Sequence, residues 1–174
     1  MMWRTHALLG VSALWLLAPV PGALTPGNVG PLCALAAFGA LLPDLDAEES
    51  KVKSLGIMGI RPFMPVARTA FRTFGHRGLL HSPLGLLMFA AVCAGVGLVW
   101  GALPGAVLWL GYASHLAGDA CTRSGIPSWP NRSGRRIHLL PVRFRLVTGS
   151  LAEDALLPLL ALPVALLLLS FLPS

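Results

Sequence analysis

Two side chains that can bind a metal ion or transfer a proton stand four residues apart at the end of an uncharged segment. His115 and Asp119 belong to the stretch GYASHLAGDA, and neither a charged residue nor a histidine occurs from Ser82 to Ser114. On a helix, residues i and i+4 leave the same face, one turn apart. An imidazole and a carboxylate so placed are either metal ligands or a structural hydrogen-bonded pair.

Other ionisable residues lie where further uncharged segments begin or end. They are His6 near the start of the chain, Asp44 and Asp46 in GALLPDLD, His76 and His81 in GHRGLLHS, and Glu153 in TGSLAED. Ionisable residues at a membrane edge are candidates for function. Because they flank separate segments, we expect several of them to meet at one end of a helical bundle.

Each of these motifs also has a local interpretation. The two aspartates follow Pro43 and can be loop carboxylates that end a helix. The two histidines of GHRGLLHS can be ordinary interfacial residues. Ser150 and Glu153 form the S-x-x-E pattern of a capping box. His138 has no partner at metal-ligand spacing and is interpreted as a solvated loop residue.

The composition indicates a membrane protein. Of 174 residues, 55% are hydrophobic and 11% charged, and the mean hydropathy is +0.74. Residues 7–43, 82–114 and 155–174 contain no charge and no histidine, and apolar stretches of this length are typical of membrane-spanning helices. We therefore predict one all-α integral-membrane domain over residues 1–174, a polytopic bundle of about 4–5 hydrophobic helices. The first segment can alternatively be read as a cleaved secretory signal.

Proline and glycine predict where the helices break. The first two expected helices cover about residues 5–20 and 31–43. The third begins at about residue 83, and after a break at 101–105 the fourth runs to about residue 120. The fifth covers about residues 151–172. Ser82-Pro83 is a favourable helix start, with serine as the cap and proline in the first turn. Pro158 and Pro163 are expected to kink the last helix.

The positive charges predict the topology. All 13 Lys and Arg residues lie near the N-terminus or in the connections 44–81 and 120–150, and none lies in 25–30 or 101–105. The positive-inside bias places these regions in the cytoplasm, which predicts a multi-pass protein of the bacterial inner membrane. The candidate ligands fall on the same side. Nucleic-acid binding is not expected, because no aromatic platform accompanies the basic residues.

Neutral imidazoles and carboxylates gathered from separate helices predict a metal site at the membrane edge. The three cysteines are scattered, so neither disulfides nor a cysteine zinc site is expected. The donor set suits Zn²⁺ first, with Mn²⁺ or Fe²⁺ as alternatives, and has room for one or two ions. The candidate ligands are His6, Asp44, Asp46, His76, His81, His115 and Asp119.

The ordered series of His6, GALLPDLD, HRGLLHS, GYASHLAGDACTRSGIPSWP and TGSLAED resembles the YdjM-type family of LexA-regulated inner-membrane metal-dependent hydrolases. The resemblance runs from His6 to about Asp154. More remotely, it is similar to bacterial zinc-dependent phospholipase C, in which an H-x-x-x-D element corresponds to His115 and Asp119. Position 149 is glycine, so the H-x-x-x-E element of that enzyme class is missing.

The resulting hypothesis is a membrane-bound hydrolase that cleaves a phosphoester, such as a phospholipid headgroup or a small molecule, through a metal-activated water. Asp46 or Glu153 is the expected general base. Arg132, Arg135 and Arg136 are weaker candidates for holding phosphate, because topology or anionic lipid also explains them. The alternatives are a divalent-metal transporter, whose site would normally lie at the bilayer midplane, and a metal-stapled membrane protein without turnover.

Overall fold

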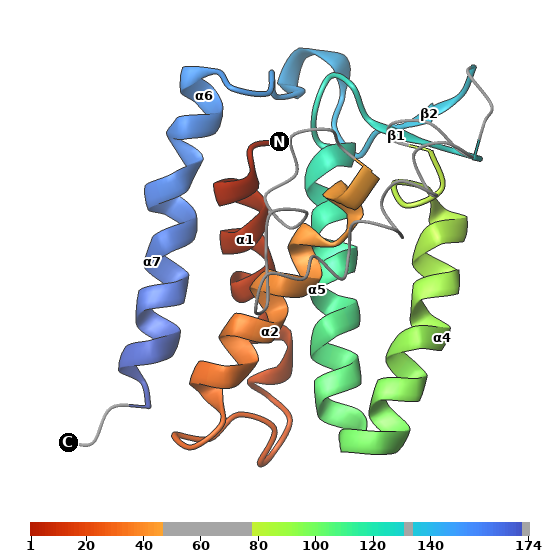
Figure 1. The fold of residues 1–174 in the computed structure, drawn as a ribbon. Helices are drawn as coiled ribbons and strands as arrows, with labels where there is room; N and C mark the ends of the chain where they lie inside the picture. The colour runs from red at the N-terminus through yellow and green to blue at the C-terminus, as the bar shows by residue number, and fades with distance from the viewer. Residues whose placement is uncertain (47–77, 131–133, 172–174) are drawn as a thin grey trace, which may run out of the picture.

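The computed structural model is mostly helical, and its long helices stand side by side (Figure 1). It describes residues 1–46, 78–130 and 134–171, without the side chains of Leu45 and Asp46. The first half contains α1 (Trp3–Ser12), the 3-10 helix η1 (Ala13–Leu17), α2 (Val29–Leu41) and the 3-10 helix η2 (Pro43–Asp46). The second half contains α4 (Pro83–Trp100), α5 (Ala102–Ala120), the short strands β1 (Ile126–Pro127) and β2 (Arg136–Ile137), η4 (Val142–Phe144), α6 (Leu151–Asp154) and α7 (Leu156–Leu169).

The all-α prediction is confirmed, although fewer helices than expected are both long and apolar enough to cross a bilayer. Within the described residues, two helical stretches have that length and composition, Pro83–Trp100 and Leu151–Leu169, and only 11% of each is buried. α2 is a shorter apolar helix. Leucines on the two long stretches point away from the bundle; Leu98, for example, is 90% exposed. Such faces suit lipid rather than water.

The break between the third and fourth predicted helices is shorter than expected. α4 ends at Trp100 and α5 begins at Ala102, so a single residue separates them. Gly101 has a φ of 96°, a conformation that glycine adopts readily and that reverses the chain. Pro104 does not prevent α5 from beginning at Ala102, because it lies in the first turn, where a backbone N–H has no acceptor within the helix.

The predicted cap of α4 is confirmed, whereas the last helix is interrupted near Pro158 but not at Pro163, which lies inside α7. The Ser82 hydroxyl accepts the Gly85 N–H at 3.2 Å and caps α4, with Pro83 in the first turn. The last helix is interrupted at Ala155, between α6 and α7. In a helix, the ring of a proline clashes with the backbone carbonyl of the residue four positions before it. For Pro158 that residue is Asp154, the last residue of α6.

α5 is the central helix of the bundle. It packs against α1, α2 and α4, whereas α7 packs against α1. Glycines allow α2 and α5 to approach closely: a Cβ at Gly39 would lie 2.5 Å from the Leu108 carbonyl oxygen, and one at Gly111 would overlap the Ala36 carbonyl. Small residues have this role at helix contacts in membrane proteins.

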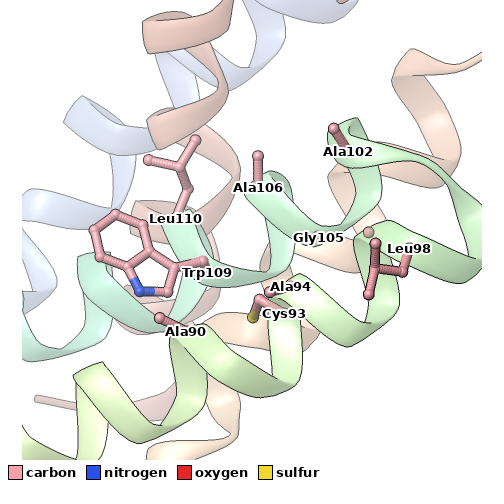
Figure 2. Close-up of a pocket in the computed structure, with 10 residues that line it drawn as sticks. Ala90, Cys93, Ala94, Leu98, Ala102, Gly105, Ala106, Trp109 and Leu110 are labelled. Atoms are coloured by element: carbon pink, nitrogen blue, oxygen red, sulfur yellow. The ribbon is translucent and has the colours of Figure 1, made fainter.

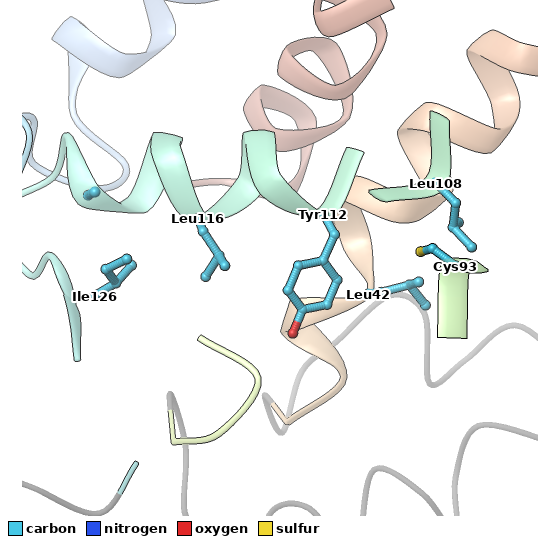
Figure 3. Close-up of a cluster of buried hydrophobic side chains, with 7 residues drawn as sticks. Leu42, Cys93, Leu108, Tyr112, Leu116 and Ile126 are labelled. Carbon is cyan, nitrogen blue, oxygen red and sulfur yellow. The ribbon is translucent and has the colours of Figure 1, made fainter. Parts of the chain in front are cut away.

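A buried apolar cluster lies below the polar end of the bundle. It contains Leu42, Cys93, Leu108, Tyr112, Leu116, Ala120 and Ile126 (Figure 3). The cluster joins α2, α4 and α5 and therefore fixes the relative positions of the segments that leave these helices. The sequence did not predict the β1–β2 pairing, in which Ile126 is opposite Ile137. Two-residue strands carry no periodic signal.

Candidate metal centre

The end of α5 carries His115 and Asp119. Both side chains are buried: His115 is 0% and Asp119 1% exposed. His115 Nε2 lies 4.0 Å from Asp119 Oδ2, which confirms that the i, i+4 spacing places them on one face. The distance is too long for a direct hydrogen bond but suits two ligands of one ion.

The backbone of α2 fixes the orientation of the His115 ring. His115 Nδ1 lies 2.7 Å from the Ala40 carbonyl oxygen, so Nδ1 is the protonated nitrogen that donates to it. The lone pair then stands on Nε2, which faces the remaining candidate residues. A backbone carbonyl on the distal nitrogen is the usual support of a metal-binding histidine.

Asp44 from η2 and His81 from the turn before α4 complete one three-residue group with His115. His81 Nε2 lies 3.2 Å from His115 Nε2 and 3.4 Å from Asp44 Oδ1, which in turn is 3.7 Å from His115 Nε2. His81 is fully buried, whereas the Asp44 side chain is 25% exposed. We call this set the open group, because Asp44 gives it access to the surface.

His6 from α1 forms a second group with His115 and Asp119. Its ring stacks on the His115 ring, with centroids 3.6 Å apart, and its Nε2 lies 3.3 Å from Asp119 Oδ1. The amine of Met1 also contacts Asp119 Oδ1, at 2.6 Å. All three members are at most 1% exposed, and we call this set the buried group.

The donor atoms have the spacing that a small divalent cation requires. Ligands at about 2.0–2.2 Å from a tetrahedral ion stand roughly 3.3–3.6 Å from one another. Six pairs of nitrogen and oxygen atoms among these five residues are 3.2–4.0 Å apart, and each group offers three ligand atoms that all lie within 4.8 Å of one another. Imidazole nitrogens and carboxylate oxygens are also suitable ligands for such an ion. The residues therefore fit a metal site.

Electrostatics keep the open group ready to bind a cation. Burial by itself raises the pKa of the Asp44 carboxyl, but the hydrogen bond from His81 and the proximity of two further histidines outweigh it and lower the pKa to about 2. Asp44 is therefore a carboxylate at neutral pH, and no proton has to leave it before a metal ion binds.

Glu153 lies at the start of α6 and binds backbone groups. Its carboxylate oxygens accept the Met2 N–H at 2.6 Å and the Gly149 N–H at 2.8 Å. The Ser150 hydroxyl accepts the Glu153 N–H at 3.4 Å, so the predicted serine cap is present. Glu153 belongs to neither three-residue group among the described residues, and its role as a base stays a prediction.

The other predicted site residues lie apart from these groups or outside the description. His76, Arg132 and the side chain of Asp46 are outside the described residues. Arg135 and Arg136 are exposed beside the β1–β2 pairing. His138 is half-buried, with Nε2 3.2 Å from the Arg123 carbonyl oxygen, and so is not simply a solvated loop residue.

Two supports of the site were not predicted. The Ala40 carbonyl is a backbone group, and no side-chain pattern identifies it. The Tyr112 hydroxyl donates to the Leu80 carbonyl at 2.6 Å and so positions the residue before His81. Tyr112 is the chain's single tyrosine and precedes His115 by three residues. A lone polar aromatic residue on the ligand-bearing face was the available signal.

Comparison with known proteins identifies close relatives of this sequence. The profile of the YdjM inner membrane protein family matches residues 1–173. Inner membrane protein YdjM of Escherichia coli K12 and that of Shigella flexneri are each 34% identical to the chain over 130 residues. The match covers 71% of this chain and 60% of each relative. No solved structure matches the chain, and the similarity to phospholipase C stays a prediction.

Proposed function

This chain belongs to the YdjM inner membrane protein family, and from that premise we propose that it is a membrane-bound, metal-dependent hydrolase of phosphoesters. One observation carries the proposal. Five ionisable side chains from α1, η2, the turn before α4 and α5 converge with nitrogen and oxygen atoms at ligand spacing; four of them are buried, namely His6, His81, His115 and Asp119, and Asp44 is partly exposed. Ionisable residues are costly in a membrane protein and are retained for function.

The two groups share a histidine with a single available nitrogen. His115 Nδ1 is engaged by the Ala40 carbonyl, so only Nε2 can bind a metal ion. The open and buried groups therefore cannot each use His115 for a separate ion at the same time. This supports one ion, preferably Zn²⁺, held by His81, His115 and a carboxylate.

A divalent ion at this position would supply Lewis-acid polarisation of a phosphoryl oxygen and acidify a nearby water molecule. The protein side chains would admit the substrate and accept the proton. Asp44 leaves an accessible side through which an ester can approach the centre. Asp46, two residues further along η2, is the preferred general base, because both carboxylate oxygens of Glu153 already accept backbone hydrogen bonds.

The basic residues of the segment 132–145 supply the phosphate-binding charge in this proposal. Guanidinium groups pair with phosphate oxygens through two parallel hydrogen bonds. Arg135 and Arg136 lie by β2, at the same end of the bundle as the candidate metal centre (Figure 1). With the positive-inside bias, this end faces the cytoplasm of a multi-pass protein.

A metal staple without turnover is the second candidate, and the buried group favours it. His6, His115 and Asp119 are enclosed, and substrate cannot reach an ion held by these three alone. The test is hydrolysis of bis(p-nitrophenyl) phosphate by detergent-purified protein that has been stripped with a chelator and reloaded with Zn²⁺ or Mn²⁺. The proposal expects turnover that returns with metal and is lost in Asp44→Asn. Tight metal binding without turnover of this or other phosphoesters would favour the staple.

A further inference from the structure

An apolar cavity of 680 Å³ lies between α1, α5 and α7. α5 and α7 both pack against α1, and the cavity occupies the space beside their contacts with it. Ala113 and Ala117 of α5 form one wall, and Leu156 and Leu160 of α7 form another. The volume is within the range of about 300–1,000 Å³ that is usual for ligand sites.

The chemistry of the wall suits a hydrocarbon chain. Two hydroxyl groups line the cavity, and both donate to backbone carbonyls: Ser12 to Leu160 at 3.4 Å and Ser114 to Gly111 at 2.7 Å. The remaining lining is almost entirely alanine, leucine and other apolar side chains. Such a wall offers a ligand apolar contacts and little hydrogen bonding.

One end of the cavity lies beside the buried group, none of whose members lines it. Gly118 and Met1 line it, and a Cβ added at Gly118 would lie 3.6 Å from His6 Cε1. Gly118 stands directly before Asp119 in the sequence. The same α5 turn thus faces the cavity on one side and carries a member of the buried group on the other.

Two arginines belong to the segment that closes the same end, although neither side chain lines the cavity. Arg145 Nε donates to the carbonyl of Leu140, a wall residue, at 3.0 Å, and the Arg143 guanidinium lies 4.8 Å from the centre of the Phe144 ring. Residues 139–146 supply Leu139, Leu140 and Leu146 to the wall and hold Arg143 and Arg145 between them. Backbone bonds fix this segment to the end of α5: Leu139 N–H donates to the Ala120 carbonyl at 2.9 Å, and Leu146 N–H donates to the Cys121 carbonyl at 3.0 Å.

We infer that this cavity binds an acyl chain of an anionic phospholipid, with the phosphate beside the segment that carries Arg143 and Arg145. An apolar wall next to a segment with two arginines matches a molecule with a hydrocarbon chain and a negative head. That this lipid is also the substrate rests on the proposed hydrolase function and would make the substrate a phospholipid.

A second apolar cavity provides the matched control. It lies between α4 and α5, has a volume of 630 Å³ and is lined by Ala94, Ala106, Trp109 and other apolar residues (Figure 2). Ala106 and Ala117 are both exposed alanines of α5, each facing one cavity. Replacing either by phenylalanine adds the same bulk to the same helix.

The experiment uses the full-length protein in vesicles of phosphatidylethanolamine and phosphatidylglycerol with a trace of phosphatidylglycerol that carries a diazirine in its acyl chain. After illumination, mass spectrometry maps the cross-linked residues. We expect labels to concentrate on the peptides that contain Ala113, Ala117, Leu156 and Leu160. Ala117→Phe should reduce this labelling about tenfold by steric exclusion, and Ala106→Phe should leave it unchanged. Labels spread evenly over α4 and α7, or equal labelling in both variants, would overturn the inference.

Rates of hydrolysis distinguish a failure of this inference from a failure of the proposed function. Bis(p-nitrophenyl) phosphate has no acyl chain, so Ala117→Phe should hydrolyse it like the wild type while losing about tenfold in phosphatidylglycerol hydrolysis. Absence of all hydrolysis, with cavity labelling intact, would contradict the hydrolase proposal and leave the lipid site standing. Hydrolysis of both substrates at wild-type rates in Ala117→Phe would contradict the lipid site and leave the hydrolase.

Discussion

The open and buried groups share His115 but differ in their surroundings. The open group, Asp44 and His81 with His115, has a carboxylate that is 25% exposed. The buried group, His6 and Asp119 with His115, has no member more than 1% exposed. The difference favours a division of labour: the buried residues join α1 to the end of α5, and the open residues would give a bound ion contact with the surface.

Removal of the shared histidine should have the largest effect. His115→Ala takes one ligand from both groups, and because loss of a second-shell partner alone costs about 10–100-fold in affinity, we expect Zn²⁺ affinity to fall by more than about 100-fold. Competition with a chromophoric chelator measures it. His138→Ala is the control, since that ring contacts the Arg123 carbonyl instead. Unchanged Zn²⁺ affinity in His115→Ala would show that neither group uses this histidine as a ligand.

The two carboxylates should separate stability from accessibility. In metal-free protein, Asp119→Asn removes the carboxylate that pairs with the buried amine of Met1 and should lower the free energy of unfolding by about 3 kcal/mol. Asp44→Asn should cost only about 1 kcal/mol, because Asp44 is partly solvated. Unfolding in mixed micelles, followed by tryptophan fluorescence, measures both. Equal losses in the two variants would remove the distinction between the groups.

Tyr112→Phe should affect the open group selectively. It deletes the hydrogen bond to the Leu80 carbonyl and loosens the turn that carries His81, so we expect a loss of about 1 kcal/mol in stability and about tenfold in Zn²⁺ affinity. The same chelator competition and unfolding assays apply. A loss of stability with full metal affinity would show that His81 does not depend on this turn.

Glu153→Gln should have the smallest effect. If Glu153 only accepts backbone hydrogen bonds at the start of α6, hydrolysis should change by less than about threefold, whereas loss of a general base costs about 10²–10⁴-fold. Asp46→Asn is the matched comparison, and there we expect the larger loss. Steady-state rates with bis(p-nitrophenyl) phosphate decide between the two carboxylates, and a hundredfold loss in Glu153→Gln would reverse their assignment.

Much of the site's arrangement could be predicted because it follows from helix ends. His115 and Asp119 follow helical periodicity, and Asp44 and His81 lie next to the ends of two helices that both pack against α5. The serine cap of α4 and the interruption before Pro158 are local effects of single residues. Each of these features depends on a few neighbouring positions, and the sequence displays them directly.

The remaining features depend on tertiary contacts or on backbone atoms. Nothing in the sequence indicates that the Ala40 carbonyl receives the His115 proton, or that the His6 ring stacks on His115. Pro104 was read as a helix break, although its place in the first turn of α5 makes it compatible with the helix. The open and buried groups differ in the exposure of their side chains. That exposure is determined by how the helices pack and is not visible in the sequence.

The metal content of the purified protein tests the central claim most directly. Elemental mass spectrometry of the detergent-purified wild type should find about one divalent ion per chain, and His115→Ala/Asp119→Ala should lose it while His138→Ala keeps it. A well-folded wild type that contains no metal, even after incubation with Zn²⁺ or Mn²⁺, would contradict the claim and leave the five residues as a structural polar cluster.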